Sequence, residues 1–154
     1  MQKITFNKLP NLKNLMTAAK DLTHVGTLAV TSENFTYLDI DDEYIHRLFP
    51  LLKSRYPQIE KAKYFGHPKL VGAHISVIYP EEKIIIEPIE LGKKYNFQTT
   101  EMVTADLGPK RYYALAITAP TLVALRKKHG LNEMLNLKGY FINLHITIGT
   151  ATLK

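Results

Sequence analysis

The chain contains no cysteine, no low-complexity segment and no apolar run long enough to cross a membrane. The lack of cysteine excludes disulfide bonds, zinc–thiolate sites and thiol nucleophiles, and it fits a reducing compartment. The longest apolar-leaning stretch, residues 112–125, is interrupted by Thr118, Pro120 and Thr121 and is too short to span a bilayer. The first residues lack an apolar core of signal-peptide length. We therefore expect a soluble, cytoplasmic protein.

Length and composition are those of one globular domain. The 154 residues are 45% apolar and 22% charged, and a chain of this length can bury a substantial core. The formal net charge is +6. A positive field raises the local concentration of anions, so a nucleotide or RNA partner suits this charge. The basic residues are scattered, so the charge alone does not identify the ligand.

Hydrophobic periodicity predicts helices and strands in the first half of the chain. A helix after Pro10 is indicated by apolar residues at i, i+3, i+4 and i+7, which are Leu12, Leu15, Met16 and Ala19. β-Prone runs at 27–30, 35–40 and 73–79 predict strands. Asp41 and Asp42 suit the start of a second helix, which Pro50 should kink or divide. Residues 65–68 are expected to form a loop.

The second half also combines strands with a helix. Residues 83–87 are expected to form a short strand, and residues 96–107 and 111–118 a long hairpin with its turn at 108–110. Pro120 opens a helix that carries basic residues near its end and stops at Gly130. A last strand is expected at 141–150. This order favours an α+β fold of mainly antiparallel sheet in a single domain, 1–154, with similar halves at about 1–80 and 81–154.

Each half carries the same short pattern. Residues 73–77 are Ala-His-Ile-Ser-Val and residues 144–148 are Leu-His-Ile-Thr-Ile, so both run apolar, histidine, apolar, hydroxyl, apolar. Side chains alternate along a strand, so His74 and Ser76 should share one face, as should His145 and Thr147. The apolar residues between them would anchor the opposite face.

This arrangement suits cleavage of a phosphodiester without a metal. One imidazole accepts a proton from the attacking water or hydroxyl and the other donates a proton to the leaving oxygen, and a pKa near 6.5 suits both tasks. Two hydroxyls beside the phosphorus can donate to its non-bridging oxygens. We predict His74 and His145 as the catalytic acid and base and Ser76 and Thr147 as the phosphate ligands, with no metal or other cofactor. Which histidine is the acid stays open.

The paired motifs resemble the double signature of the 2H phosphoesterase superfamily. That group includes RNA 2′,3′-cyclic phosphodiesterases, LigT-like proteins, viral 2′-5′-oligoadenylate phosphodiesterases and phage enzymes that destroy cyclic-nucleotide signals. The resemblance implies two similar α+β lobes around a central cleft and hydrolysis of a cyclic 2′,3′ or a 2′-5′ phosphodiester in an RNA-derived or nucleotide substrate. Ser76 stands where threonine is common and can make the same hydrogen bond. The branch stays open, with the small Swiss Army Knife group as one candidate.

Two other functions stay open. A single histidine in a strand is usually structural, and the same cleft could bind a phosphorylated ligand without turning it over, which the charge of +6 also fits. Metal-dependent hydrolysis is less favoured, because no carboxylate or third histidine stands at ligand spacing beside either motif. No feature indicates an obligatory protein partner.

Residues outside the motifs are assigned structural roles. Solvated or capping positions are expected for the remaining histidines, His24, His46, His67 and His129. The acidic group Asp39, Asp41 and Asp42 is interpreted as a helix N-cap rather than a divalent-cation site. Strand alternation turns Tyr79 away from His74, which predicts a core position. Three basic residues in predicted loops could meet substrate phosphates but are interpreted as solvated surface: Lys69, Lys110 and Arg111.

Overall fold

The computed structural model describes residues 2–65 and 70–153, in which strands alternate with a few short helices. The strands are β1 (Asn7–Lys8), β2 (Val25–Val30), β3 (Thr36–Asp39), β4 (Glu60–Lys61), β5 (His74–Ile78), β6 (Lys94–Asn96), β7 (Gln98–Leu107), β8 (Lys110–Thr118), β9 (Leu135–Leu137), β10 (Tyr140–Ile142) and β11 (His145–Thr152). The helices are α1 (Lys13–Lys20), α2 (Glu43–His46), α3 (Leu48–Arg55) and α4 (Pro120–Lys128), with 3₁₀ turns η1 (Pro80–Glu82) and η2 (Pro88–Glu90). Most of the loop predicted at 65–68 lies outside the described residues, as do His67 and Lys69.

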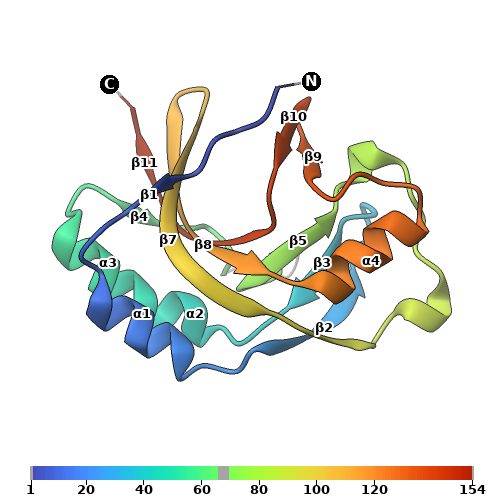
Figure 1. The fold of residues 1–154 in the computed structure, drawn as a ribbon, viewed down its shortest axis with the longest axis horizontal. Helices are drawn as coiled ribbons and strands as arrows, with labels where there is room; N and C mark the ends of the chain where they lie inside the picture. The colour runs from blue at the N-terminus through green and yellow to red at the C-terminus, as the bar shows by residue number, and fades with distance from the viewer. Residues whose placement is uncertain (1, 66–69, 154) are drawn as a thin grey trace.

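Two antiparallel sheets and a small hairpin make up the β structure. The five-stranded sheet has the order β1-β7-β8-β11-β4, the four-stranded sheet has the order β5-β3-β2-β6, and β9 pairs with β10. In Figure 1 the curved β7–β8 pair crosses the centre, with α1, α2 and α3 at the lower left and α4 beside β5 at the right. This is the α+β fold of mainly antiparallel sheet with flanking helices that the sequence predicts.

Each sheet takes strands from both parts of the chain. β6 completes the four-stranded sheet by pairing with β2, and after Phe97 the chain enters the five-stranded sheet as β7. Conversely, two strands from the first part of the chain, β1 and β4, form the edges of the five-stranded sheet, whose other strands come from the second part. The division into halves at residue 80 stays a prediction, because the sheets themselves do not separate there.

Apolar helix faces cover the five-stranded sheet at one end of the molecule. Leu15 of α1 and Leu52 of α3 are buried where α1 lies against α3 and β7. The helix predicted after Pro10 is confirmed as α1. The helix that Pro50 should divide is split into α2 and α3 at Arg47. Pro50 therefore falls in the first turn of α3, where a missing N–H leaves no helical hydrogen bond unmade.

The short strand predicted at 83–87 is wrong. These residues run between η1 and η2 without a strand partner in the described part of the chain. Lys83 has a left-handed φ of 58°, which turns the chain at the start of the segment, and Ile85 is 82% exposed. An apolar run becomes a strand only where a neighbour completes its hydrogen bonds.

The predicted hairpin is confirmed as β7 and β8, and the last predicted strand, 141–150, is divided into two strands, β10 and β11. Asn143 and Leu144 separate β10 from β11, which begins at His145. β10 folds back on β9, a strand that the sequence pattern did not indicate. The motif histidine thus stands at the start of β11 rather than within a longer strand.

Candidate active site

His74 and His145 occupy equivalent positions in their strands. Each is the first residue of its strand, β5 or β11. Each Nδ1 lies 2.8 Å from the backbone carbonyl two residues earlier, that of Gly72 for His74 and that of Asn143 for His145. Because a carbonyl oxygen only accepts, Nδ1 carries the hydrogen and donates it. Nε2 is therefore the ring nitrogen that can exchange a proton.

The backbone conformation of Gly72, whose carbonyl contacts His74, is one that favours glycine. Its φ of +73° lies in the left-handed region that favours glycine, and a Cβ there would come within 2.6 Å of an Asp42 side-chain oxygen. The same Asp42 oxygen accepts a hydrogen bond from Ala73 N at 3.0 Å. Asp42 is the N-cap residue of α2, as predicted, but its side chain bonds the turn before His74 instead of the helix. Asp41 caps the start of α2 instead, because its side chain accepts a hydrogen bond from Glu43 N at 2.9 Å.

Ser76, Thr147 and His145 meet at one cavity of about 140 Å³. Ser76 and Thr147 are both buried polar residues, and they come from the two different sheets. The rest of the wall is apolar or aromatic, and its residues include Ile4, Phe6, Leu137, Ile142, Tyr64 and Tyr112. Three of the four predicted site residues are thus brought together around a space suited to a small group.

His74 lies beside this cavity, on an adjoining open pocket of about 290 Å³. Tyr64 lines both spaces. Its ring meets the His74 ring edge-on with centroids 4.6 Å apart, and an interaction with the Thr147 side chain opposes the rise that burial causes in the pKa of Tyr64. A positive charge on His145 also lowers the pKa of His74, so the two imidazoles are close enough to interact electrostatically. Tyr64 therefore bridges the two motifs.

Burial lowers the pKa of both histidines. For His74 the loss of hydration is the largest cause; the Gly72 carbonyl, which favours the charged ring, opposes it, and His145 adds to the lowering. For His145 burial again outweighs the opposing effect of the Asn143 carbonyl. Above pH 6.5 both rings are therefore mainly neutral in the ligand-free protein. A neutral imidazole can accept a proton, and a bound phosphate would favour a positive charge on one of the two.

Two tyrosines join the motif hydroxyls, and the sequence did not place either of them there. Burial raises the pKa of Tyr79 to about 12, and a hydrogen bond with Ser76 opposes this shift. The core position predicted for Tyr79 is wrong: it is half-buried and lines the cavity, because β5 ends at Ile78 and strand alternation no longer applies. Tyr64 follows β4 in an irregular segment and belongs to no pattern that would have marked it.

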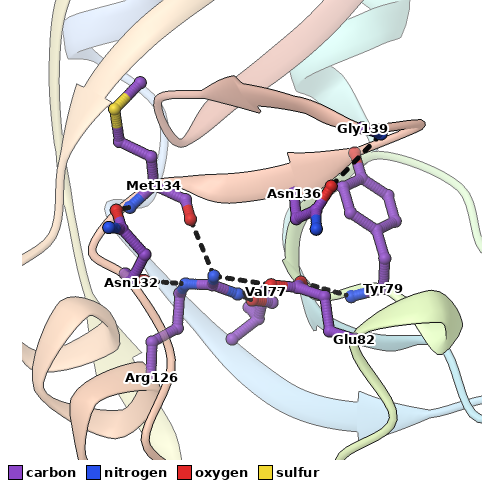
Figure 2. A network of polar contacts seen from close by, with 8 residues as sticks. All are labelled: Val77, Tyr79, Glu82, Arg126, Asn132, Met134, Asn136 and Gly139. Atoms are coloured by element: carbon purple, nitrogen blue, oxygen red, sulfur yellow. Dashed lines mark hydrogen bonds and ion pairs between the residues drawn. The ribbon is translucent and has the colours of Figure 1, made fainter. Parts of the chain in front are cut away.

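A buried ion pair supports the first motif strand. Arg126 of α4 and Glu82 of η1 have side chains that are 0% and 3% exposed, with Nη2 and Oε2 2.7 Å apart. Figure 2 shows Arg126 donating to the backbone carbonyls of Val77, Asn132 and Met134 as well. Glu82 also accepts from Tyr79 N at 3.0 Å. This network therefore ties β5 and the start of η1 to α4 and to the segment that leads into β9.

The remaining residues considered from the sequence have other partners. His24 Nε2 lies 3.2 Å from the Ala19 carbonyl, and His129 Nε2 lies 2.9 Å from Glu90. Arg111 pairs with Asp106 across the β7–β8 turn, while Lys110 is exposed. Within residues 2–65 and 70–153 no group of three or more histidine, aspartate and glutamate side chains is placed to hold a metal ion. No helix in the same ranges is long and apolar enough to span a membrane.

A family model described as "Swiss Army Knife, 2H phosphoesterase domain" matches residues 36–152 of the chain. The match contains both histidine motifs, every strand of the two sheets except β1 and β2, and Tyr64, Tyr79 and Arg126. No curated protein and no solved structure matches the chain significantly.

Proposed function

Because the chain belongs to the Swiss Army Knife family of 2H phosphoesterase domains, we propose that it is a metal-independent phosphodiesterase acting on cyclic 2′,3′ or 2′-5′ phosphodiester bonds in RNA-derived or oligonucleotide substrates. Membership of the family makes it a phosphoester hydrolase in general terms. The kind of bond, the substrate and the roles of the residues are the content of the proposal.

The observation that carries the proposal is the matched restraint of the two histidines. Both rings are fixed by the same Nδ1–carbonyl contact of 2.8 Å, and each motif adds a buried hydroxyl, Ser76 or Thr147, at the cavity. A structural histidine needs no such duplication in a second sheet. General acid–base catalysis needs two proton-exchanging groups, held in position, near one phosphorus.

The geometry supports a simple hydrolytic step. One neutral imidazole takes a proton from water through Nε2 while the water oxygen forms a bond to phosphorus. The other imidazole, protonated in the presence of the anionic substrate, gives its Nε2 proton to the leaving ribose oxygen as the P–O bond breaks. The hydroxyls of Ser76 and Thr147 donate to non-bridging oxygens, where negative charge develops. The orientation of the substrate decides which of His74 and His145 is the base.

The first prediction concerns the two histidines. His74→Ala and His145→Ala should each lower kcat by about 10²–10⁴-fold, because each removes a general acid or base. The measurement is product release from 2′,3′-cyclic nucleotides, 2′-5′ oligoadenylates and cyclic dinucleotides in the presence of EDTA. His24→Ala is the matched control, since His24 lies against the Ala19 carbonyl, outside both cavities. Urea unfolding of each variant separates lost chemistry from lost folding.

Three outcomes would contradict the proposal. Wild-type rates in either motif variant would remove the acid–base roles. Activity that disappears with EDTA would replace them with metal-dependent hydrolysis. Saturable binding of a nucleotide with no product from any of these substrates would favour a non-catalytic binding module that uses the same cleft.

A further inference from the structure

A second, larger hollow opens beside the catalytic cavity. It has a volume of about 540 Å³ and is lined by the segment around β4 and by the neighbouring ends of β8 and β11. Tyr64 and Tyr112 line this hollow and the 140 Å³ cavity alike. We call it the lysine groove, after Lys61, Lys63 and Lys110 in its wall. The two hollows are therefore neighbours that share a wall formed by these two tyrosines.

The strand register aligns the groove with the catalytic hydroxyl. Along β8, Ala114 pairs with Thr147, Tyr112 with Thr150 and Lys110 with Thr152. Paired residues in an antiparallel sheet lie on the same face, and residues two apart in a strand are about 7 Å apart. Lys110 therefore lies on the same face of the sheet as Thr147. Along β8 it is four residues, or two steps of about 7 Å, from Ala114, the residue that pairs with Thr147. The groove is a continuation of the catalytic face.

The groove offers positive charge that is not used inside the protein. Lys63 and Lys110 are exposed, and within the described residues neither forms an ion pair. Lys61 differs, because its Nζ lies 5.7 Å over the Phe49 ring. Glu60 is the acidic residue in the described wall, so the lysines outnumber it. The hydroxyls of Thr150 and Thr152 line the same space.

From these observations we infer that the lysine groove binds a second phosphate of the substrate, so that the substrate is an oligonucleotide rather than a mononucleotide. The inference rests on the proposed function for the position of the scissile phosphate, between the two motifs. Lys63 and Lys110 contact the backbone phosphate of the adjoining nucleotide. Tyr112 and Tyr64, at the boundary between the two spaces, offer aromatic faces on which a base can stack.

The test compares ligands that differ in chain length. His74→Ala/His145→Ala, which should bind without hydrolysis, is titrated calorimetrically with 2′,3′-cyclic AMP and with oligoadenylates of two, three and four nucleotides that end in a 2′,3′-cyclic phosphate. We expect affinity to rise by roughly 3- to 10-fold beyond the mononucleotide, the range of two exposed charge contacts. The salt dependence of log K should also steepen by about 0.7 for each phosphate contact.

Charge-removing variants locate the effect. In the same background, Lys63→Gln/Lys110→Gln should reduce the ratio of oligonucleotide to mononucleotide affinity to below about twofold and should flatten the salt slope. The matched control is Lys93→Gln/Lys94→Gln, which removes equal charge from exposed positions at and beside β6, in the other sheet. Lys93→Gln/Lys94→Gln should leave the ratio of oligonucleotide to mononucleotide affinity unchanged.

The inference and the proposed function fail separately. Equal affinity for all chain lengths, no detectable binding of any of these ligands, or an equal loss in both lysine variants would overturn the inference. If wild-type protein hydrolyses 2′,3′-cyclic AMP through His74 and His145 at the same time, the proposed function stands. Length-dependent binding that the lysines control, with no product from wild-type protein, would overturn the function and keep the groove.

Discussion

At the residue scale, the two motif histidines combine a fixed tautomer with a lowered pKa. Each carbonyl contact at Nδ1 holds the ring in both protonation states, since Nδ1 carries a hydrogen in each of them. Burial makes the charged state less favourable for His74 and for His145, and each carbonyl offsets only part of that cost. The proton on Nε2 is therefore easily given up, which suits a group that must act as an acid in one step and as a base in the reverse step.

The pH dependence of kcat/KM follows from these shifts. A general base must be neutral, so the rate rises as pH increases through its pKa; a general acid must be protonated, so the rate falls as pH increases through its pKa. Both free-protein pKa values are lowered from the model value of 6.5. The bell-shaped profile of kcat/KM should therefore be centred below pH 6.5. The measurement is the rate of hydrolysis of a 2′,3′-cyclic nucleotide in a series of buffers that extends to either side of pH 6.5.

Variants assign the two limbs of that profile. His74→Ala should remove one limb, whereas His24→Asn should leave both limbs in place, because His24 has no part in the site. An optimum above pH 7 with both limbs intact would mean that burial does not control the protonation of the two motif histidines.

At the element scale, prediction succeeded where a pattern and a partner coincide. Amphipathic spacing marked α1, and the His-x-hydroxyl alternation marked β5 and β11 as strands, which place Ser76, His145 and Thr147 at one cavity and His74 on the pocket beside it. Residues 84–86 show where this kind of prediction fails: they form an apolar run but no strand, because the run gives no information about whether a neighbouring strand is present. β1 and β4 have two residues each and no periodicity to detect. Tyr64 and Tyr79 reach the site from outside regular strands, where alternation says nothing about direction.

The pair of Arg126 and Glu82 gives a prediction at the same scale. Arg126→Met leaves a buried carboxylate and three backbone carbonyls without their donor, so it should lower the free energy of unfolding by about 3–5 kcal/mol. Adding Glu82→Gln should recover part of this loss, because the uncompensated charge is removed. Urea denaturation with a common m-value measures both effects.

A surface ion pair in which one partner, Lys127, also lies on α4 serves as the control. Lys127 and Glu133 have side chains that are 58% and 62% exposed, and Lys127→Met should cost less than about 1 kcal/mol. A loss of that small size for Arg126→Met would show that the network in Figure 2 does not hold β5 against α4.

At the scale of the whole molecule, the site depends on both sheets and on the first residues of the chain. Ser76 comes from the four-stranded sheet and Thr147 from the five-stranded sheet. Ile4 and Phe6 close one side of the cavity, and Ile4 N donates to the Phe141 carbonyl at 2.7 Å, which fastens this segment to β10. The site is therefore complete only when the two ends of the chain have come together.

The interleaved strands predict that the chain folds as one cooperative unit. A fragment 1–80 would lack β6, the partner of β2, and a fragment 81–154 would lack both edge strands of its sheet, β1 and β4. Each fragment would also expose the apolar surface that α1 and α3 share with β7 and β11. The full chain should therefore unfold in one transition, with a ratio of van't Hoff to calorimetric enthalpy of about 1, while neither fragment should show a cooperative transition by circular dichroism. Two resolved transitions in the full chain, or cooperative melting of fragment 1–80 alone, would instead mean that the sheets are independent and that the cavity between them forms by docking of two preformed parts.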